Sequence, residues 1–402
     1  MRKYTALAGF AAALLLTANA QAQITKDTIK IGVLADMSSL YADLGGPGSV
    51  MAAKMAVEDF GGTLNGKKIE VVSADHQNKP DVGASIARQW FDQDGVDMIT
   101  DLTTSSVALA VQEVARKENK VLLITSAASS DLTGKACAPT SIHWMYDTVA
   151  LANGTGAAVV KAGGDTWFFI TADYAFGHSL QNDTTSVVEA NGGKVLGSVN
   201  VPLNTADFSS YLLQAQASKA KVIGLANAGG DTINSIKQAA EFGIVKGGQK
   251  LAGLLVFASD VHSLGLETAQ GLQLTEGFYW DMDDQTRAWS KKFFDKMNKE
   301  PTMAHAGVYS AVMNYLNAVK AVNTLDGPTV VKQLKSKPIN DFAIRNGHIR
   351  DDGSLAHDMY LFEVKKPSES KGPWDFYKLI ATIPGDQAFK RPHGNECPAA
   401  KG

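Results

Sequence analysis

The first part of the chain repeats one pattern of apolar and polar residues: a short apolar run, a loop, and then an amphipathic segment. Apolar runs of the kind that form buried strands lie at residues 28–34, 68–73, 98–99 and 121–124. Segments with apolar side chains at helical spacing lie between and after them, at residues 49–60, 80–92 and 107–115. Such a β-loop-α repeat predicts an open, mostly parallel sheet with helices on its faces.

The same pattern begins again near residue 147 and predicts a second α/β lobe. We expect its helices at residues 147–161, between residues 177 and 190, and at 208–218 and 231–242. We expect its strands at residues 166–171, 194–200, 221–226 and 251–257. A strand at 271–279 and helices at 284–298 and 303–323 indicate a return to the first lobe, followed by short strands and loops after residue 352. Because no Pro-rich or Ser-rich linker separates the lobes, several short crossings should join them.

The first 22 residues are typical of a secretory signal. Arg2 and Lys3 precede an uncharged apolar core at residues 6–16, and Ala20-Gln21-Ala22 fits a small-x-small cleavage site. The apolar core is too short to span a bilayer, and no later run is long enough. We therefore expect an exported, soluble protein that begins at Gln23. Its length favours two domains.

Charge and cysteine content narrow the possible partners. The net charge is −3, and it becomes more negative without the basic signal, which argues against nucleic acid or an anionic membrane surface as a partner. The only two cysteines are Cys137 and Cys397. In an oxidising compartment such a pair predicts one disulfide between the turn at residues 136–139 and the C-terminal tail. The cysteine spacing fits neither a redox motif nor a metal site.

Two clusters of hydroxyl residues follow the third and fourth predicted strands. They are Thr103-Thr104-Ser105-Ser106 and the segment T-S-A-A-S-S at residues 125–130. Ligands of open α/β sheets bind beyond the carboxyl ends of the strands. The first cluster also precedes a helix, where free N–H groups and hydroxyls favour an anion. The two loops therefore suggest a carboxylate cradle, although Ser and Thr also cap helices without any ligand.

Motifs for catalysis, phosphate and metal are missing from the sequence. Residues 177–181 lack the last glycine of a G-x-S-x-G elbow, and no H-E-x-x-H or paired histidines occur. The Gly45-Gly46-Pro47-Gly48 loop has neither P-loop spacing nor a following lysine, so turn geometry explains it better. Asp281-x-Asp283-Asp284 is best interpreted as helix N-terminal charge. We expect no metal, no cofactor and no catalytic residues. A secreted two-lobe hydrolase whose triad assembles only in space is the alternative from another class.

With these features in view, the chain resembles the periplasmic solute-binding proteins of ABC importers, and among them the leucine/isoleucine/valine-binding family. The resemblance rests on I-K-I-G-V-L-A-D-M-S-S-L-Y-A-D-L-G-G-P-G at residues 29–48, T-T-S-S-V-A-L-A-V-Q-E-V-A at 103–115, I-T-S-A-A-S-S-D-L-T-G at 124–134 and D-Y-A-F-G at 173–177. It implies the type I periplasmic binding protein fold, which is α/β with two Rossmann-like lobes and open parallel sheets joined by a three-crossing hinge. The lobes would comprise residues 23–147 plus about 274–355, and residues 148–273 plus about 356–402.

The resemblance also implies a function and site residues. A monomer in the periplasm would close on a small carboxylate in the inter-lobe cleft and deliver it to a membrane permease. By position, the carboxylate contacts are Thr104 or Ser105, the backbone of Ala127, and Ser129. Tyr174 would close over the ligand from the second lobe, and Asp260 lies near the acid that meets an amino acid's ammonium group.

Three departures from the family pattern suggest the ligand. Leu44 and the Ala228-Gly229-Gly230 segment replace aromatic positions, which would widen the cleft at Gly229, and Asp260 is shorter than glutamate. Some relatives bind aromatic carboxylic acids, and a wider cleft with ring partners would suit a benzoate-like ligand. A branched-chain or other hydrophobic amino acid is the alternative. The candidate ring partners, which core packing could also explain, are Tyr41, Tyr146, Tyr174 and Phe278.

Overall fold

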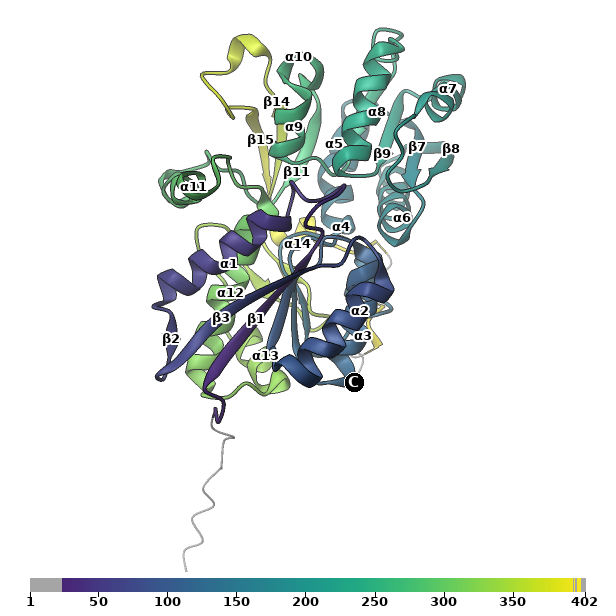
Figure 1. The fold of residues 1–402 in the computed structure, drawn as a ribbon. Coiled ribbons are helices and arrows are strands. Elements are labelled where there is room, and N and C mark those ends of the chain that lie inside the picture. Colours follow the sequence, from purple (N-terminus) through teal and green to yellow (C-terminus); the bar gives the residue numbers. More distant parts are fainter. Residues whose placement is uncertain (1–23, 393, 395, 399–402) are drawn as a thin grey trace, which may run out of the picture.

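The computed structural model describes residues 24–392, 394 and 396–398, which form two α/β lobes, one above the other in Figure 1. The expected signal segment lies outside these residues. The first lobe contains a six-stranded sheet in the order β2-β3-β1-β4-β5-β6, in which all neighbours are parallel except β2 and β3. Its strands are β1 (Thr28–Ala35), β2 (Thr63–Leu64), β3 (Lys67–Asp75), β4 (Met98–Asp101), β5 (Val121–Ile124) and β6 (Ser141–His143).

Helices cover both faces of this sheet because successive strand residues point to opposite sides. Val121 and Leu123 share a buried cluster with α1 and α12, whereas Leu122 and Ile124 share another with α2 and α3. The continuous apolar runs in the sequence are therefore strands that are buried on both faces. The helices of this lobe are α1 (Gly46–Phe60), α2 (Pro80–Gln89) with its continuation η1 (Trp90–Asp94), α3 (Ser105–Lys117), η2 (Ser130–Leu132), α11 (Asp284–Met297), α12 (Met303–Val322) and α13 (Gly327–Lys335).

The second lobe contains a four-stranded parallel sheet in the order β10-β9-β7-β8. Its strands are β7 (Thr166–Ala172), β8 (Lys194–Val201), β9 (Val222–Ala226) and β10 (Lys250–Gly253). Its helices are α4 (Thr148–Leu151), η3 (Ala152–Gly156), α5 (Ala157–Lys161), α6 (Ala175–Ala190), α7 (Ser209–Ala217), α8 (Gly229–Glu241), α9 (Ala258–Leu264) and α10 (Leu266–Ala269). The repeated β-loop-α pattern of the sequence thus becomes two parallel sheets, as expected.

A three-stranded antiparallel sheet extends the second lobe. It is formed by β11 (Gln273–Glu276), β14 (Met359–Val364) and β15 (Tyr377–Ile383), with η4 (Pro367–Glu369) between the last two. Leu274 and Phe362 share a buried cluster with Ile170 and Leu225 of the four-stranded sheet. This differs from the expected return to the first lobe at residues 271–279, because β11 pairs with a strand from the C-terminal part of the chain. The chain rejoins the first lobe at α11.

Besides the C-terminal tail, three segments cross between the lobes, and they meet at His357. They are the segment between β6 and α4, the segment between β11 and α11, and the segment between β13 (Leu355–Ala356) and β14; β13 pairs with β12 (His348–Ile349). His357 Nε2 lies 2.7 Å from the Met145 carbonyl oxygen. A Cβ on Gly277 would lie 3.0 Å from the His357 ring, so only glycine allows this approach. The predicted three-crossing hinge is confirmed.

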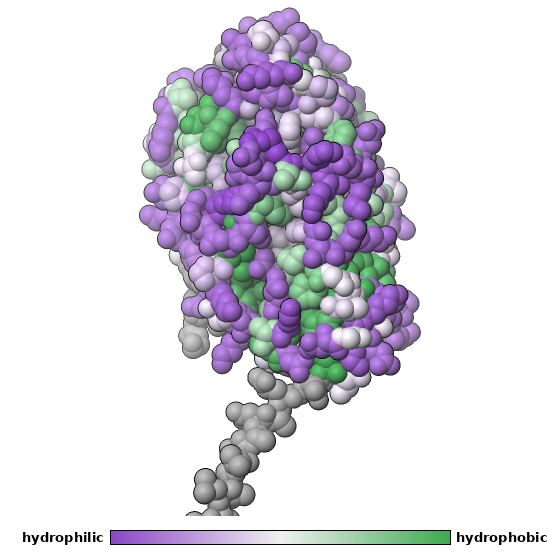
Figure 2. All heavy atoms as spheres, turned by 90° about the vertical axis from the view of Figure 1, so that its left-hand side faces the viewer, coloured by the Kyte–Doolittle hydropathy of each residue, from purple (hydrophilic) through white to green (hydrophobic). Residues whose placement is uncertain are grey.

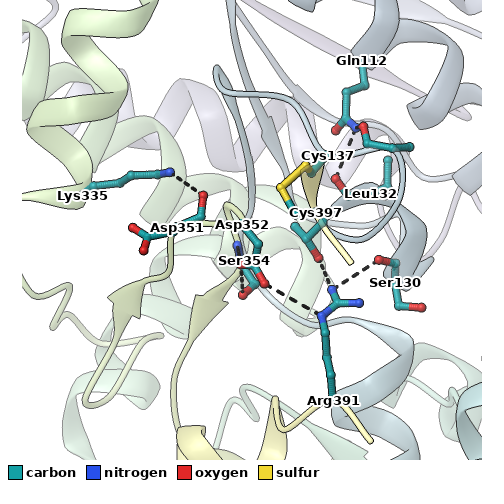
Figure 3. Close-up of a disulfide and its surroundings, with 12 residues drawn as sticks. Gln112, Ser130, Leu132, Cys137, Lys335, Asp351, Asp352, Ser354, Arg391 and Cys397 are labelled. Carbon is teal, nitrogen blue, oxygen red and sulfur yellow. Dashed lines mark hydrogen bonds and ion pairs between the residues drawn. A yellow bond between two sulfur atoms is a disulfide. The ribbon is translucent and has the colours of Figure 1, made fainter. Parts of the chain in front are cut away.

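The C-terminal tail returns from the second lobe to the first. After β15 and α14 (Gly385–Ala388), Arg391 donates to the carbonyl of Ser130 at 3.3 Å, and Cys397 forms a disulfide with Cys137. Figure 3 shows Arg391 beside the disulfide, with its Nε 3.8 Å from Asp352 Oδ2. The predicted disulfide is confirmed, and it fixes the tail to the first lobe.

The surface is mixed in character. On the face shown in Figure 2, hydrophilic side chains cover most of the molecule, and hydrophobic ones gather mainly in its lower part, which is the first lobe. Within the described residues, no helix combines the length and the apolar character that crossing a bilayer requires.

Candidate functional site

The two hydroxyl loops lie side by side at the carboxyl ends of β4 and β5. The carbonyl of Asp101, the last residue of β4, accepts hydrogen bonds from the N–H groups of Thr125 (3.2 Å) and Ser126 (3.3 Å). Ser105 opens α3, and its Oγ accepts from the N–H groups of Ala128 (3.2 Å) and Ser129 (3.1 Å). These bonds join the loops into one structure, as the parallel-sheet geometry requires.

Thr103, Ser105 and Ser126, which all carry hydroxyls, line a small cavity between the lobes. Ser105 Oγ already accepts two hydrogen bonds, which leaves its O–H free to donate. Thr103 Oγ1 accepts from the N–H of Asp36 at 2.8 Å and lies 3.1 Å from His76 Nε2. Ser126 Oγ is buried and makes no hydrogen bond of normal geometry.

The hydrogen bond at Nδ1 of His76 shows which ring nitrogen carries the proton. Nδ1 accepts a hydrogen bond from the N–H of Asn78 at 3.0 Å, so the proton is on Nε2, which donates to Thr103. Burial lowers the pKa of His76 to about 4, although Asp36 and Asp75 raise it, so the ring is neutral at physiological pH. Thr103 therefore also accepts two bonds and keeps its own hydrogen for another acceptor. The hydroxyls of Thr103 and Ser105 can therefore each donate one hydrogen bond to a further acceptor.

The other residues predicted for the carboxylate lie around this group. Thr104 turns its hydroxyl away from the cavity, to the Asn78 side-chain oxygen. Of the two alternatives at this position, Ser105 is the one that faces the cavity. Ala127 accepts from His143 through its carbonyl at 2.6 Å, while its N–H makes no hydrogen bond within the described residues. Ser129 Oγ lies 2.6 Å from Ser179 Oγ of the second lobe.

Three tyrosines line the same cavity. The hydroxyls of Tyr41, from the first lobe, and Tyr174, from the second, form a 2.8 Å hydrogen bond across the cleft. The Tyr146 hydroxyl donates to the Ser126 carbonyl. Burial raises the pKa of all three hydroxyls well above their ordinary value, so they are neutral donors. The structure thus brings the hydroxyl loops and three of the four predicted ring partners together.

The cavity is small because the two lobes are closed on each other. Its volume is about 10 Å³, which is the room needed by roughly one water molecule. A larger ligand therefore requires Tyr41 and Tyr174 to separate. The residues that line the cavity are Tyr41, Leu44, Thr103, Ser105, Ser126, Ala128, Tyr146, Tyr174, Phe176, Ala228 and Leu255.

The small residues at 228–230 do not widen this closed cleft, contrary to the sequence-based expectation. Gly229 has a φ of +55°, and a Cβ there would lie 2.7 Å from the Leu40 carbonyl oxygen and 3.0 Å from Tyr41 Cδ1. The first lobe therefore fills the space that a missing side chain would leave. Gly229 does not line the cavity in the described residues, whereas Ala228 does. The glycine allows the lobes to approach closely.

Asp260 and Phe278 lie away from the cavity lining. Asp260 Oδ2 accepts from the N–H of Phe257 at 2.9 Å at the start of α9, and the side chain is buried. Burial raises the pKa of Asp260 to about 7, although this hydrogen bond lowers it. Phe278 packs edge-on against Trp289 and Phe342, with ring centroids 5.9 Å apart in both pairs. Of the aromatic candidates, Phe278 is part of the core.

Some lining residues carried no separate prediction. Thr103, Ser126 and Ala128 lie within the hydroxyl loops, so they were found as a motif and not as individual contacts. Phe176 follows Tyr174 in the D-Y-A-F-G segment, where its position after β7 is a usable signal. Leu255 follows β10 in an apolar run and cannot be distinguished from core by sequence. No group of three potential metal ligands occurs within the described residues.

Two α/β lobes that close over a cleft at the carboxyl ends of their strands define the class of two-lobe solute-binding proteins. A family model described as periplasmic binding protein matches residues 28–372, so the chain belongs to this family. It is a periplasmic solute-binding protein of the ABC-transporter type, which confirms the resemblance.

Solved structures support this assignment. A periplasmic binding protein from Burkholderia mallei is 56% identical, with a TM-score of 0.91 over 93% of this chain and 99% of that one. A branched chain amino acid ABC transporter periplasmic ligand-binding protein from Burkholderia xenovorans is 42% identical, with a TM-score of 0.83 over 92% and 100%. A solute binding protein from R. palustris, solved in complex with benzoate, shares the fold at 19% identity, with a TM-score of 0.79 over 89% and 97%.

Proposed function

We propose that this protein captures a small aromatic carboxylic acid in the cleft between its lobes and delivers it to the permease of an ABC importer. The observation that carries the proposal is the set of hydroxyls at Thr103, Ser105 and Ser126. Two of them use their oxygen to accept two hydrogen bonds each, and the third is buried beside the Asp101 carboxyl, with no hydrogen bond of normal geometry within the described residues. All three residues line the cavity, and the free hydrogens of Thr103 and Ser105 suit a ligand that only accepts.

The carboxylate end of the ligand would lie against these hydroxyls. A carboxylate has no donor hydrogens and accepts several hydrogen bonds, which matches donors whose accepting side is occupied. The N-terminus of α3 adds a favourable partial charge, because Ser105 is its first residue. The unpartnered N–H of Ala127 provides a further donor in the neighbouring loop.

The opposite end of the cleft favours a ring. Tyr41, Tyr146, Tyr174 and Phe176 surround the cavity together with Leu44 and Leu255. When the lobes open, the tyrosine pair separates, and an aromatic ligand can replace the ring contacts that are lost. The R. palustris protein with benzoate shows that this fold accommodates such a ligand.

An amino acid is the alternative ligand, and the similarity to the branched chain amino acid transporter protein of Burkholderia xenovorans supports it. The position of Asp260 argues against it, because its carboxyl group caps α9 instead of lining the cavity. An α-ammonium group would then lack its expected acid. The aromatic acid is therefore the preferred ligand.

The affinity needed for import is within reach of these contacts. A micromolar Kd corresponds to roughly −8 kcal/mol. Charge-assisted hydrogen bonds contribute about 1.5–3 kcal/mol each, and burial of a ring adds to them. Part of this energy is spent on ordering the ligand and the two lobes.

Isothermal titration calorimetry of the purified protein tests the proposal. We expect benzoate or cinnamate to bind and leucine or valine to bind at least tenfold more weakly. The reverse order would refute the aromatic preference, and the absence of binding by any of these acids would refute the carboxylate.

Ser126→Ala tests the cradle itself, because it removes a hydroxyl of a lining residue whose neighbour is the Asp101 carboxyl and which makes no hydrogen bond of normal geometry within the described residues. We expect it to raise the Kd of the carboxylate about tenfold. Ser290→Ala is the matched control, since Ser290 Oγ is also buried and unpartnered but lies on α11, away from the cavity. Equal affinities of the two variants would contradict the assignment.

A further inference from the structure

Helix α6 of the second lobe carries a row of polar groups that face the first lobe. Tyr174 is its N-cap residue, and Ser179 and Asp183 follow on its surface. Residues four apart in a helix lie on the same face, so Ser179 and Asp183 point in one direction. The helix thus carries three polar side chains in succession, of which Tyr174 and Ser179 bond directly to the first lobe.

Each of these groups has a partner at the cradle or beside it. Tyr174 bonds to Tyr41, and Ser179 Oγ lies 2.6 Å from Ser129 Oγ. Asp183 Oδ2 accepts from the Thr148 hydroxyl at 2.6 Å.

Thr148 connects Asp183 to the same cradle loop. Its Oγ1 accepts from the N–H of Ser130 at 3.0 Å, and its own N–H donates to the Ala128 carbonyl at 2.8 Å. The segment from Ala128 to Ser130 is therefore attached to α6 at two points, once directly and once through Thr148. This is the loop that also holds Ser126 and Ala127.

The contacts of Ser179 and Asp183 lie at the edge of a cavity and not within a packed interface. Next to them the lobes leave a polar cavity of about 500 Å³, with Asp131, Lys135, His178 and Asn182 among its lining residues. The Ser129–Ser179 bond therefore stands at the edge of an open space. Burial raises the pKa of Asp183 to about 6, although Thr148 and Ser130 lower it. Desolvation of this carboxylate therefore opposes the free energy gained from its hydrogen bonds. Such contacts favour one relative position of the lobes over others.

We propose that Ser179 and Asp183 are positioning residues that couple closure of the lobes to ligand capture. Ser179 holds the loop at residues 128–130 directly, and only when α6 has reached the first lobe, whereas Asp183 acts on the same loop by orienting Thr148. Closure then completes the cradle, and the filled cradle in turn holds the lobes closed. The ligand in this role is the carboxylate of the proposed function. The contacts between α6 and the first lobe do not depend on that proposal.

The test uses the full protein with benzoate as the probe. We expect Ser179→Ala to raise the dissociation rate of benzoate about tenfold, measured by stopped-flow fluorescence, and Asp183→Asn to raise it severalfold. The association rate should change little, because capture by the open form does not need α6. Ser179→Thr, which keeps a hydroxyl, should restore most of the effect. Ser210→Ala on α7 is the matched control, since Ser210 is an exposed serine of the same lobe.

A double-mutant cycle separates this role from simple packing. If Ser129 and Ser179 act as one contact, the double variant with alanine at both positions should dissociate no faster than either single variant. Additive effects, or a Ser179→Ala rate equal to that of the control, would overturn the proposal.

A second measurement keeps the test valid if benzoate is not a ligand. Small-angle X-ray scattering of the unliganded protein reports the balance of open and closed forms. Wild type should be more compact than Ser179→Ala and the same as Ser210→Ala. Equal scattering from wild type and Ser179→Ala would refute the closure contact, whereas a missing benzoate signal alone refutes only the proposed ligand.

Discussion

The buried carboxyl group of Asp101, below the cradle, allows a quantitative test of how burial of a charge changes the stability of the first lobe with pH. The residue ends β4, its side chain is fully buried, and neither carboxyl oxygen makes a hydrogen bond of normal geometry. Burial raises its pKa to about 6; the Ser126 and Ser49 hydroxyls lower it, and Asp36 raises it further. Asp101→Asn removes the charge and keeps the shape. Asparagine also tolerates the φ of +79° at this position.

The sign of the effect follows from proton binding. The pKa is about 6 in the folded protein and 3.8 for an aspartate side chain in water, so between these values the folded state binds the proton more strongly. The stability contribution of Asp101 is therefore fully present below about pH 4 and is lost as the pH rises through 6. A shift of about two pKa units corresponds to roughly 3 kcal/mol. Asp101→Asn should escape this loss.

Urea unfolding of wild type and Asp101→Asn at pH 4, 6 and 8, with the disulfide oxidised, measures the difference. We expect the free energy of unfolding of the variant relative to wild type to increase by roughly 3 kcal/mol from pH 4 to pH 8. Asp92→Asn, at an exposed position, is the control and should show no such trend. A pH-independent difference for Asp101→Asn would refute the view that this carboxyl is buried at a cost.

Three further predictions concern the cleft and the tail. Tyr41→Phe removes the 2.8 Å bond to Tyr174, which stabilises the closed unliganded form and must break when a ring enters, so it should lower the ligand Kd about fivefold in calorimetry, corresponding to roughly 1 kcal/mol; unchanged affinity would show that the bond does not contribute to closure. Gly229→Ala places a Cβ 2.7 Å from the Leu40 carbonyl and should weaken ligand binding more than tenfold without unfolding either lobe, whereas Gly243→Ala, at a φ of +65° with open space around it, should bind normally. Replacing Cys137 and Cys397 by serine should lower the free energy of unfolding in urea by about 5–6 kcal/mol, since the bond closes a loop across 260 positions; a dithiothreitol-treated wild type should match the variant, and a loss below 1 kcal/mol would contradict this account.

Much of the fold could be predicted because it follows from local patterns. The apolar runs at residues 98–99 and 121–124 are strands buried on both faces, and the hydroxyl clusters after them must meet at one edge of a parallel sheet. The disulfide was predicted from two cysteines in a chain that we expected to be exported. By contrast, β11 was placed with the wrong neighbours, because its partner β14 lies more than eighty positions later in the chain and antiparallel pairing leaves no local mark.

The site could be predicted only as far as its loops. The strand ends indicated the two hydroxyl loops, and the family resemblance proposed Thr104 or Ser105, Ala127 and Tyr174, but neither could decide which way the neighbouring hydroxyls turn. Thr104 bonds to Asn78, which belongs to the loop after β3, and that contact exists only once the sheet has formed. Asp260 illustrates the same limit, since whether an acid caps its own helix or faces a cleft depends on one side-chain torsion and not on sequence spacing.

Gly229 shows why the width of such a cleft cannot be deduced from one lobe. A small residue leaves room only if nothing from the opposite lobe moves into it, and here Leu40 and Tyr41 do. The ring of Tyr41 thus contacts the glycine on one side while its hydroxyl holds Tyr174 on the other. A ligand ring that enters must break this contact, so it has to supply an equivalent surface to the second lobe when the lobes close again. Under the proposed function, selection depends on how well the ligand replaces Tyr41 as the partner of Tyr174 and Gly229, and we expect an aromatic ring to do so better than a short aliphatic side chain.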